Sequence, residues 1–182
     1  MARLEPVVLL ALAGCGSAAT NNHPEHAFAR LRIAIESGDA RRLYEALELT
    51  TQWSVMSIHR AERGMWRLAS RFPQGPREVA IARYDAAGRA DGPETFFASL
   101  GFVERLRTGM GEVRQREALP GGNVVFITVA QGRYVVARGP DGRWGFAGLR
   151  DELERRKEHA INALALMQQS AEGYRRSAAG AR

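Results

Sequence analysis

Cysteine and histidine are scarce in this chain of 182 residues, and each scarcity removes a class of chemistry. Cys15 is the only cysteine, so no disulfide forms within the chain and the fold must be stabilised by packing. The four histidines are His23, His26, His59 and His159. His23 and His26 could in principle bind a metal with Glu25, but no second pair of ligands lies nearby in the sequence, and a solvated terminus is the preferred interpretation. We therefore expect no metal site.

The local motifs of common catalytic and nucleotide-binding sites are absent as well. The sequence contains no HExxH, GxSxG, GxxxxGKS/T or EF-hand pattern. His59 and Glu62 match one half of a di-iron motif without a second half, and we expect them at the surface. Asp141 and Gly142 in GPDGRWGFAG are typical of a tight turn. The sequence thus predicts no catalytic, cofactor-binding or metal-binding residue.

Basic residues outnumber acidic ones, 26 to 20, which gives a net charge of +6. Such a balance permits nucleic acid or an anionic membrane as a partner. No run of four basic residues occurs, however, and the largest cluster, Arg155-Arg156-Lys157, has acidic neighbours on a predicted helix. This pattern indicates a solvated helix face, so we expect no nucleic-acid binding. Binding of anionic surfaces through arginines is a lower-ranked possibility.

The first fifteen residues have the layout of an export signal. Arg3 supplies positive charge, positions 7–13 are a short apolar run, and the small residues Ala13 and Gly14 precede Cys15. The apolar run is far shorter than the roughly 20 residues of a transmembrane helix. The segment therefore predicts a signal that is cleaved.

The stretch Leu12-Ala13-Gly14-Cys15 resembles the lipobox of bacterial lipoproteins. The resemblance implies that the Cys15 thiol receives diacylglycerol and that residues 1–14 are removed as a lipoprotein signal peptide. Cys15 would then be the lipidated N-terminus, and several acyl chains would hold the protein in the membrane almost permanently.

Residues 15–24 predict a flexible tether, because GSAATNNHP is rich in residues that favour turns and open coil. An Asp after the cysteine would resemble the inner-membrane retention signal of enterobacteria, but residue 16 is Gly. We therefore expect the outer membrane of a bacterial envelope, with the protein facing the periplasm.

The remaining sequence predicts an α+β fold of N-terminal helices, a four-stranded antiparallel meander and a long C-terminal helix, with residues 25–176 in one domain. Helical periodicity begins at Pro24, resumes after Asp39 as N-cap, and resumes again after Thr50 or Thr51. A fourth helix is predicted in PREVAIARYDAAG. A fifth is predicted from Pro93, with apolar residues on one face at Phe96, Leu100 and Val103.

The periodicity changes in the second half of the chain. VRQREAL, VVFITVA, RYVVAR and RWGFA predict strands, and the turn sequences PGGN, QG and GPDG between them predict an antiparallel meander. A helix follows from position 151 to 176, with an apolar stripe at steps of three and four, and residues 177–182 predict a frayed tail. The stripe suits packing across the sheet of the same chain, or a partner protein.

Two stretches resemble the nuclear transport factor 2 superfamily of cystatin-like α+β proteins. One is PDGRWGFAGL, which is similar to the turn and tryptophan strand that end the superfamily's curved sheet, and the other is the helical pattern of residues 34–47. The resemblance implies a pocket between helices and sheet, such as ketosteroid-isomerase relatives possess.

Two functions from different classes are compatible with these features. The first is a lipid-anchored envelope protein that acts as a non-catalytic binding or structural module, with the helix 151–176 as a surface for an envelope partner. The alternative is a small-ligand binder or isomerase-like enzyme with a pocket between helices and sheet. Its lining candidates are Trp53, Trp66, Tyr134, Trp144 and Phe146, although aromatic residues at such spacing more often form the core. The absence of a catalytic motif favours the first.

Overall fold

The computed structural model describes residues 23–180. The predicted signal peptide, Cys15 and residues 15–22 of the predicted tether lie outside these residues, as do positions 181 and 182 of the predicted tail. Among the described helices, none combines the length and the apolar composition that crossing a membrane requires.

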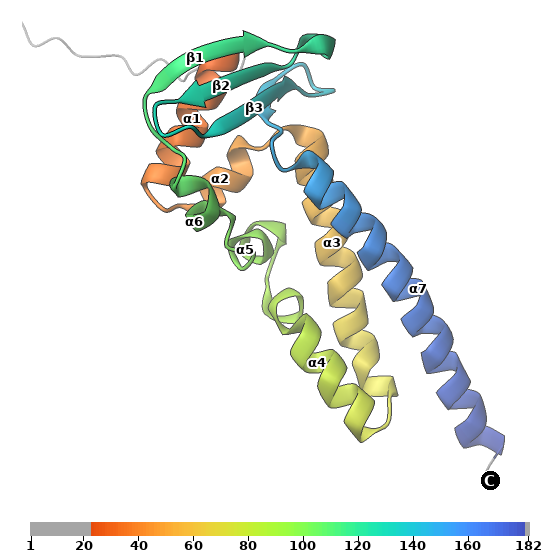
Figure 1. The fold of residues 1–182 in the computed structure, drawn as a ribbon. Coiled ribbons are helices and arrows are strands. Elements are labelled where there is room, and N and C mark those ends of the chain that lie inside the picture. Colours follow the sequence, from red (N-terminus) through yellow and green to blue (C-terminus); the bar gives the residue numbers. More distant parts are fainter. Residues whose placement is uncertain (1–22, 181–182) are drawn as a thin grey trace, which may run out of the picture.

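The elements form a head and a stem (Figure 1). In chain order they are α1 (Pro24–Glu36), α2 (Ala40–Ala46), α3 (Leu49–Leu68), η1 (Ala69–Arg71), α4 (Gln74–Arg89), α5 (Pro93–Ala98), α6 (Phe102–Arg107), β1 (Val113–Ala118), η2 (Pro120–Gly122), β2 (Val124–Thr128), β3 (Arg133–Arg138), β4 (Trp144–Phe146) and α7 (Arg150–Gly180). The head comprises the sheet with α1, α2 and α6, and the stem comprises α3, α4 and α7. Helix α5 lies at their junction.

The sheet is an antiparallel meander in the order β1-β2-β3-β4, and this confirms the α+β prediction. Alternating residues of β2 and β3 face α1, where Phe28 stacks on Phe126 with ring centroids 4.6 Å apart. Tyr134 meets the same ring of Phe28 edge-on. The predicted tight turn at Asp141 is also confirmed, since Gly142 has a φ of +77° and the Asp141 carboxylate accepts a hydrogen bond from the backbone N–H of Arg143.

Three predicted helix starts are confirmed and one is corrected. Pro24 and Pro93 lie in the first turns of α1 and α5, and Asp39 caps α2 by accepting from two backbone N–H groups. Helix α3, however, is capped by Glu48, not by Thr50 or Thr51 as expected. The Glu48 carboxylate occupies the capping position because it also accepts a hydrogen bond from α7.

The predicted fifth helix is two short helices, which corrects a second expectation. Gly101 has a φ of +70°, a left-handed conformation that ends α5 and redirects the chain into α6. The apolar face of this segment is therefore bent, and Phe97 and Phe102 stack against each other across the bend with centroids 5.2 Å apart. Phe96 is left to face the stem, where it stacks on His59.

The C-terminal helix α7 packs along α3, and the expectation that it crosses the sheet is wrong. Both helices run from the head towards the far end of the stem (Figure 1). Leu164 lies over Gly64, where an added Cβ would stand 3.3 Å from its side chain. The apolar stripe of α7 was predicted correctly, but it packs against α3 and not against the sheet, because α7 begins beside the first turn of α3. The helix also continues through residues 177–180 of the expected tail.

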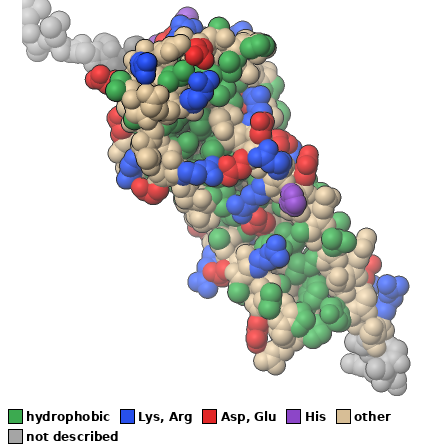
Figure 2. Space-filling view, in the orientation of Figure 1, with side chains coloured by type: hydrophobic (Ala, Val, Ile, Leu, Met, Phe, Trp, Pro, Cys, Tyr) green, Lys and Arg blue, Asp and Glu red, His purple; other side chains and the backbone are tan. Residues whose placement is uncertain are grey.

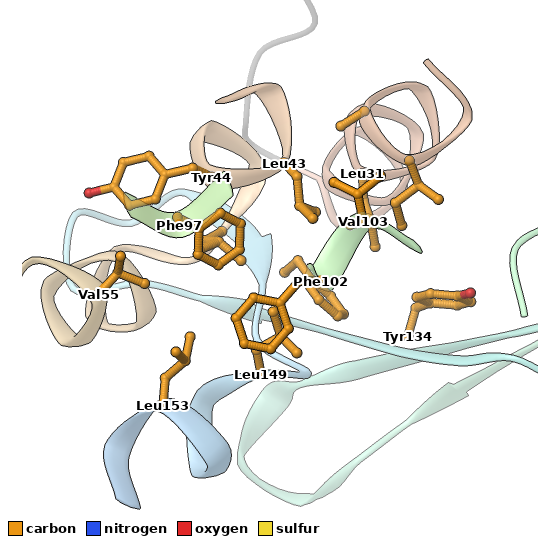
Figure 3. Close-up of a cluster of buried hydrophobic side chains, with 14 of the residues drawn as sticks. Leu31, Leu43, Tyr44, Val55, Phe97, Phe102, Val103, Tyr134, Leu149 and Leu153 are labelled. Carbon is orange, nitrogen blue, oxygen red and sulfur yellow. The ribbon is translucent and has the colours of Figure 1, made fainter. Parts of the chain in front are cut away.

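The buried core joins the head to the stem. Figure 3 shows side chains from both parts converging, and those labelled come from α1, α2, α3, α5, α6, β3 and the start of α7. Leu31, Leu43, Val55 and Leu153 have no exposed surface. Burial of such side chains contributes roughly 1.5–3 kcal/mol each, so this cluster is the main force that holds the stem to the head.

Candidate binding surface on the helical stem

Glu48 is a buried carboxylate at the point where the stem leaves the head. Its oxygens accept hydrogen bonds from the backbone N–H groups of Thr50 at 2.9 Å and Thr51 at 3.3 Å, and from the Thr51 hydroxyl at 3.2 Å. Nη2 of Arg150, in the first turn of α7, donates to Oε2 at 2.9 Å. One carboxylate thus joins the first turns of α3 and α7.

The sheet approaches the same residue closely. The Glu48 N–H donates to the carbonyl of Phe146 at 3.0 Å, and a Cβ on Gly145 would lie 2.5 Å from the Glu48 nitrogen. Burial raises the pKa of Glu48, but the hydrogen bonds from Thr50 and Arg150 and the Arg150 charge outweigh it, so the pKa lies below its usual value. The carboxylate is therefore ionised at pH 7, and both of its oxygens already accept hydrogen bonds within the protein. Its role is structural.

Further polar contacts join α3 to α7 along the stem. The Ser54 hydroxyl donates to Glu154, which also pairs with Lys157. Farther from the head, Nη2 of Arg156 on α7 lies 2.9 Å from the Glu62 carboxylate on α3. Glu62, expected at the surface, is therefore half-buried in an ion pair between helices. These contacts fix the register of α7 on α3.

The aromatic candidates for a pocket are not brought together. Tyr134 and Phe146 are buried in the core of the head, where Tyr134 donates to the carbonyl of Leu106 at 2.7 Å. Trp53 is 50% exposed on the stem. Trp66 packs on Gly88 of α4, and Trp144 lies at the edge of the sheet. Their dispersal removes the lining proposed for a site between helices and sheet.

Exposed hydrophobic side chains gather on the stem. Of the ten large hydrophobic residues that are exposed in the described part of the chain, seven lie on α3, α4 and α7; these are Trp53, Met56, Val79, Ile81, Ile161, Leu166 and Tyr174. Figure 2 shows hydrophobic side chains at the surface of the lower stem. Helix α4 has only Ala87 fully buried among its 16 residues. The stem therefore offers more apolar surface than its own packing uses.

Two of the hollows on the stem involve α7. One, of about 330 Å³, lies between the three helices and is lined by Met65, Tyr84, Ala160 and Ala163 together with the Glu62–Arg156 pair. The other, of about 770 Å³, lies at the far end, where Phe72 meets Tyr174 edge-on with ring centroids 5.4 Å apart. The first hollow is mainly polar, because Arg83 and His159 also line it. The second is mainly apolar and is edged by Arg71, Glu172 and Arg175, an arrangement that suits a protein-binding site.

His59 is buried, which corrects the expectation that it lies at the surface. It is 7% exposed and stacks on Phe96 at 5.4 Å between centroids. Burial and the nearby Arg63 charge lower its pKa. The spacing in the sequence could have indicated this burial, because His59 stands four residues after the buried Val55 and so lies on the same side of α3.

The other histidines bring no ligand set together. His23 and His26 lie one turn apart, with ring centroids 5.6 Å apart. Within residues 23–180, no group of three or more His, Cys, Asp or Glu side chains has an arrangement that could hold a metal ion.

Comparison with known proteins gave no match for this chain among family models, curated proteins or solved structures. Its function is therefore inferred from the geometry of the described residues.

Replacing Glu48 by Gln should lower the free energy of unfolding by about 2 kcal/mol at pH 7, because Arg150 would lose its buried partner and α3 its charged cap. The folded pKa of Glu48 lies below the ordinary value of 4.5, so its contribution is complete above that pH and disappears as the pH falls through the folded pKa. Urea unfolding of both proteins from pH 7 to pH 3 should show the difference shrinking.

Glu45→Gln is the matched control, since Glu45 forms only an exposed pair with Arg41. It should change stability by less than about 0.5 kcal/mol. Equal effects of the two substitutions would show that Glu48 does not hold the stem.

Proposed function

We propose that this protein is a lipid-anchored bacterial envelope protein that acts as a non-catalytic binding module. Its proposed anchor is Cys15, and its proposed binding surface is the stem formed by α3, α4 and α7. The observation that carries the second part is the concentration of exposed hydrophobic side chains on these three helices.

The position of the chain ends supports this arrangement. The described chain begins at α1, whose first turn is tied to the sheet by the ion pair between Glu25 and Arg116. The stem ends at the opposite end of the molecule (Figure 1). A lipid at Cys15 would therefore attach to the head side, and the stem would project away from the membrane towards a periplasmic partner.

Burial of these exposed side chains by a partner would also release enough free energy for binding. Val79 is 70% exposed and Leu166 is 64% exposed. Covering such side chains is worth roughly 1–2 kcal/mol each by the apolar area that is removed from water. A partner that covered several of them would gain enough to offset the entropy lost on association.

The anchor is tested on the mature N-terminus. Mass spectrometry of the envelope protein should find that it begins at Cys15 and carries acyl chains, and that Cys15→Ser abolishes both modification and membrane retention. The change removes the only thiol of the chain, at a position outside the described residues. A mature chain that still contains residues 1–14, or an unmodified Cys15, would contradict the anchor.

The binding surface is tested by charge placed on the stem. The double variant Val79→Glu/Leu166→Glu should lose the complexes that crosslinking retrieves from intact envelopes with the unaltered protein, because a carboxylate cannot be buried against an apolar partner without a large cost. The control is Ile33→Glu/Val113→Glu in the head, at residues that are 51% and 43% exposed. If both variants retain the same complexes, the stem is not the binding surface.

A further inference from the structure

A surface groove of about 440 Å³ runs along α3, and we call it the arginine groove. It is lined by Met56, His59, Arg60, Arg63, Gly64 and Arg67 of α3 and by Pro93 of α5. Met56, Gly64 and Pro93 contribute no charged side chain, so the three guanidinium groups and the imidazole supply its polar chemistry. No carboxylate lines it.

The three arginines have no acidic partner among the described residues. Glu62, the one carboxylate on α3, points to α7 and pairs with Arg156. Arg60 and Arg63 stand three residues apart, and Arg63 and Arg67 stand four apart, and like charges at these spacings repel each other across the helix surface. An anion in the arginine groove would relieve this repulsion.

His59 lines the same groove. Its Nε2 atom is buried and has no hydrogen-bond partner. The charged groups that act on the ring are Arg63, which lowers the pKa, and Glu62, which raises it; the carbonyls of Ala87 and Ala90 also raise it, while α5 contributes the uncharged ring of Phe96. Burial outweighs the groups that raise the pKa, so the imidazole is neutral at pH 7.

We propose that the arginine groove binds a polyanion that carries phosphoryl groups. Guanidinium groups match phosphate oxygens with paired N–H donors, and a groove without carboxylates does not repel them. Seven residues separate Arg60 from Arg67, which is about 10 Å along a helix and longer than one phosphate. The ligand therefore has at least two anionic groups, either in a soluble phosphate chain or in the headgroups of a lipid surface.

Inorganic tripolyphosphate and phosphatidylglycerol vesicles distinguish the two sources. Calorimetric titration of the full chain should show saturable binding of one of them that weakens as salt is raised. The double variant Arg60→Gln/Arg63→Gln should weaken this binding at least tenfold. Binding of tripolyphosphate identifies a soluble ligand, and binding of vesicles alone identifies a lipid headgroup.

The control has the same net charge. Arg77→Gln/Arg114→Gln removes two arginines from α4 and β1, away from the groove, and should change the affinity less than twofold. In NMR titrations the bound anion should raise the pKa of His59 in the control but not in the groove variant. Equal losses in the two variants, an unmoved His59 pKa, or no saturable binding of either probe would overturn the proposal. None of these results depends on whether the stem binds a protein.

Discussion

Two helices leave the head side by side because one buried carboxylate holds the first turn of each. Glu48 caps α3, accepts the Arg150 guanidinium of α7, and donates its own N–H to the end of β4. Parts of the chain that are about 100 residues apart are thereby fixed at one point. This junction starts α3 and α7 beside each other, and the contacts of Ser54 with Glu154 and of Glu62 with Arg156 fix their register farther along the stem.

Much of the fold is visible in the sequence because local chemistry determines it. Alternating β-branched residues, hairpin turns such as Asp141-Gly142, and the Asp39 cap act over a few residues, and each was predicted correctly. The bend at Gly101 was not predicted, because a single glycine between two helical patterns is equally compatible with one continuous helix.

Contacts between distant parts of the chain could not be predicted in this way, because a sequence pattern indicates which face of a helix is buried but not which element covers it. The stripe of α7 is real, yet it meets α3 and not the sheet. Glu48 was missed for a related reason: Thr50 and Thr51 are the usual capping residues, and the advantage of Glu48 comes from Arg150, 102 residues away. Nothing local marks such a pair.

The stem buries fewer of its large hydrophobic side chains than the head does. Helix α4 rests on α3 with few of its side chains fully buried, and α7 adds Ile161, Leu166 and Tyr174 to the exposed hydrophobic residues of the stem. The head, by contrast, encloses its aromatic residues between α1 and the sheet. The packed head thus positions a stem whose apolar side chains stay exposed, and the proposed binding rests on this difference between the two parts.

The central claim, that the stem is covered in the cell, is tested most directly by hydroxyl-radical footprinting of the protein in intact envelopes and after purification. The account predicts that Val79 and Leu166 are modified several-fold more slowly in envelopes than in the purified protein, while Val113 in the head is modified at the same rate in both. Equal modification of the stem residues in the two preparations would contradict it.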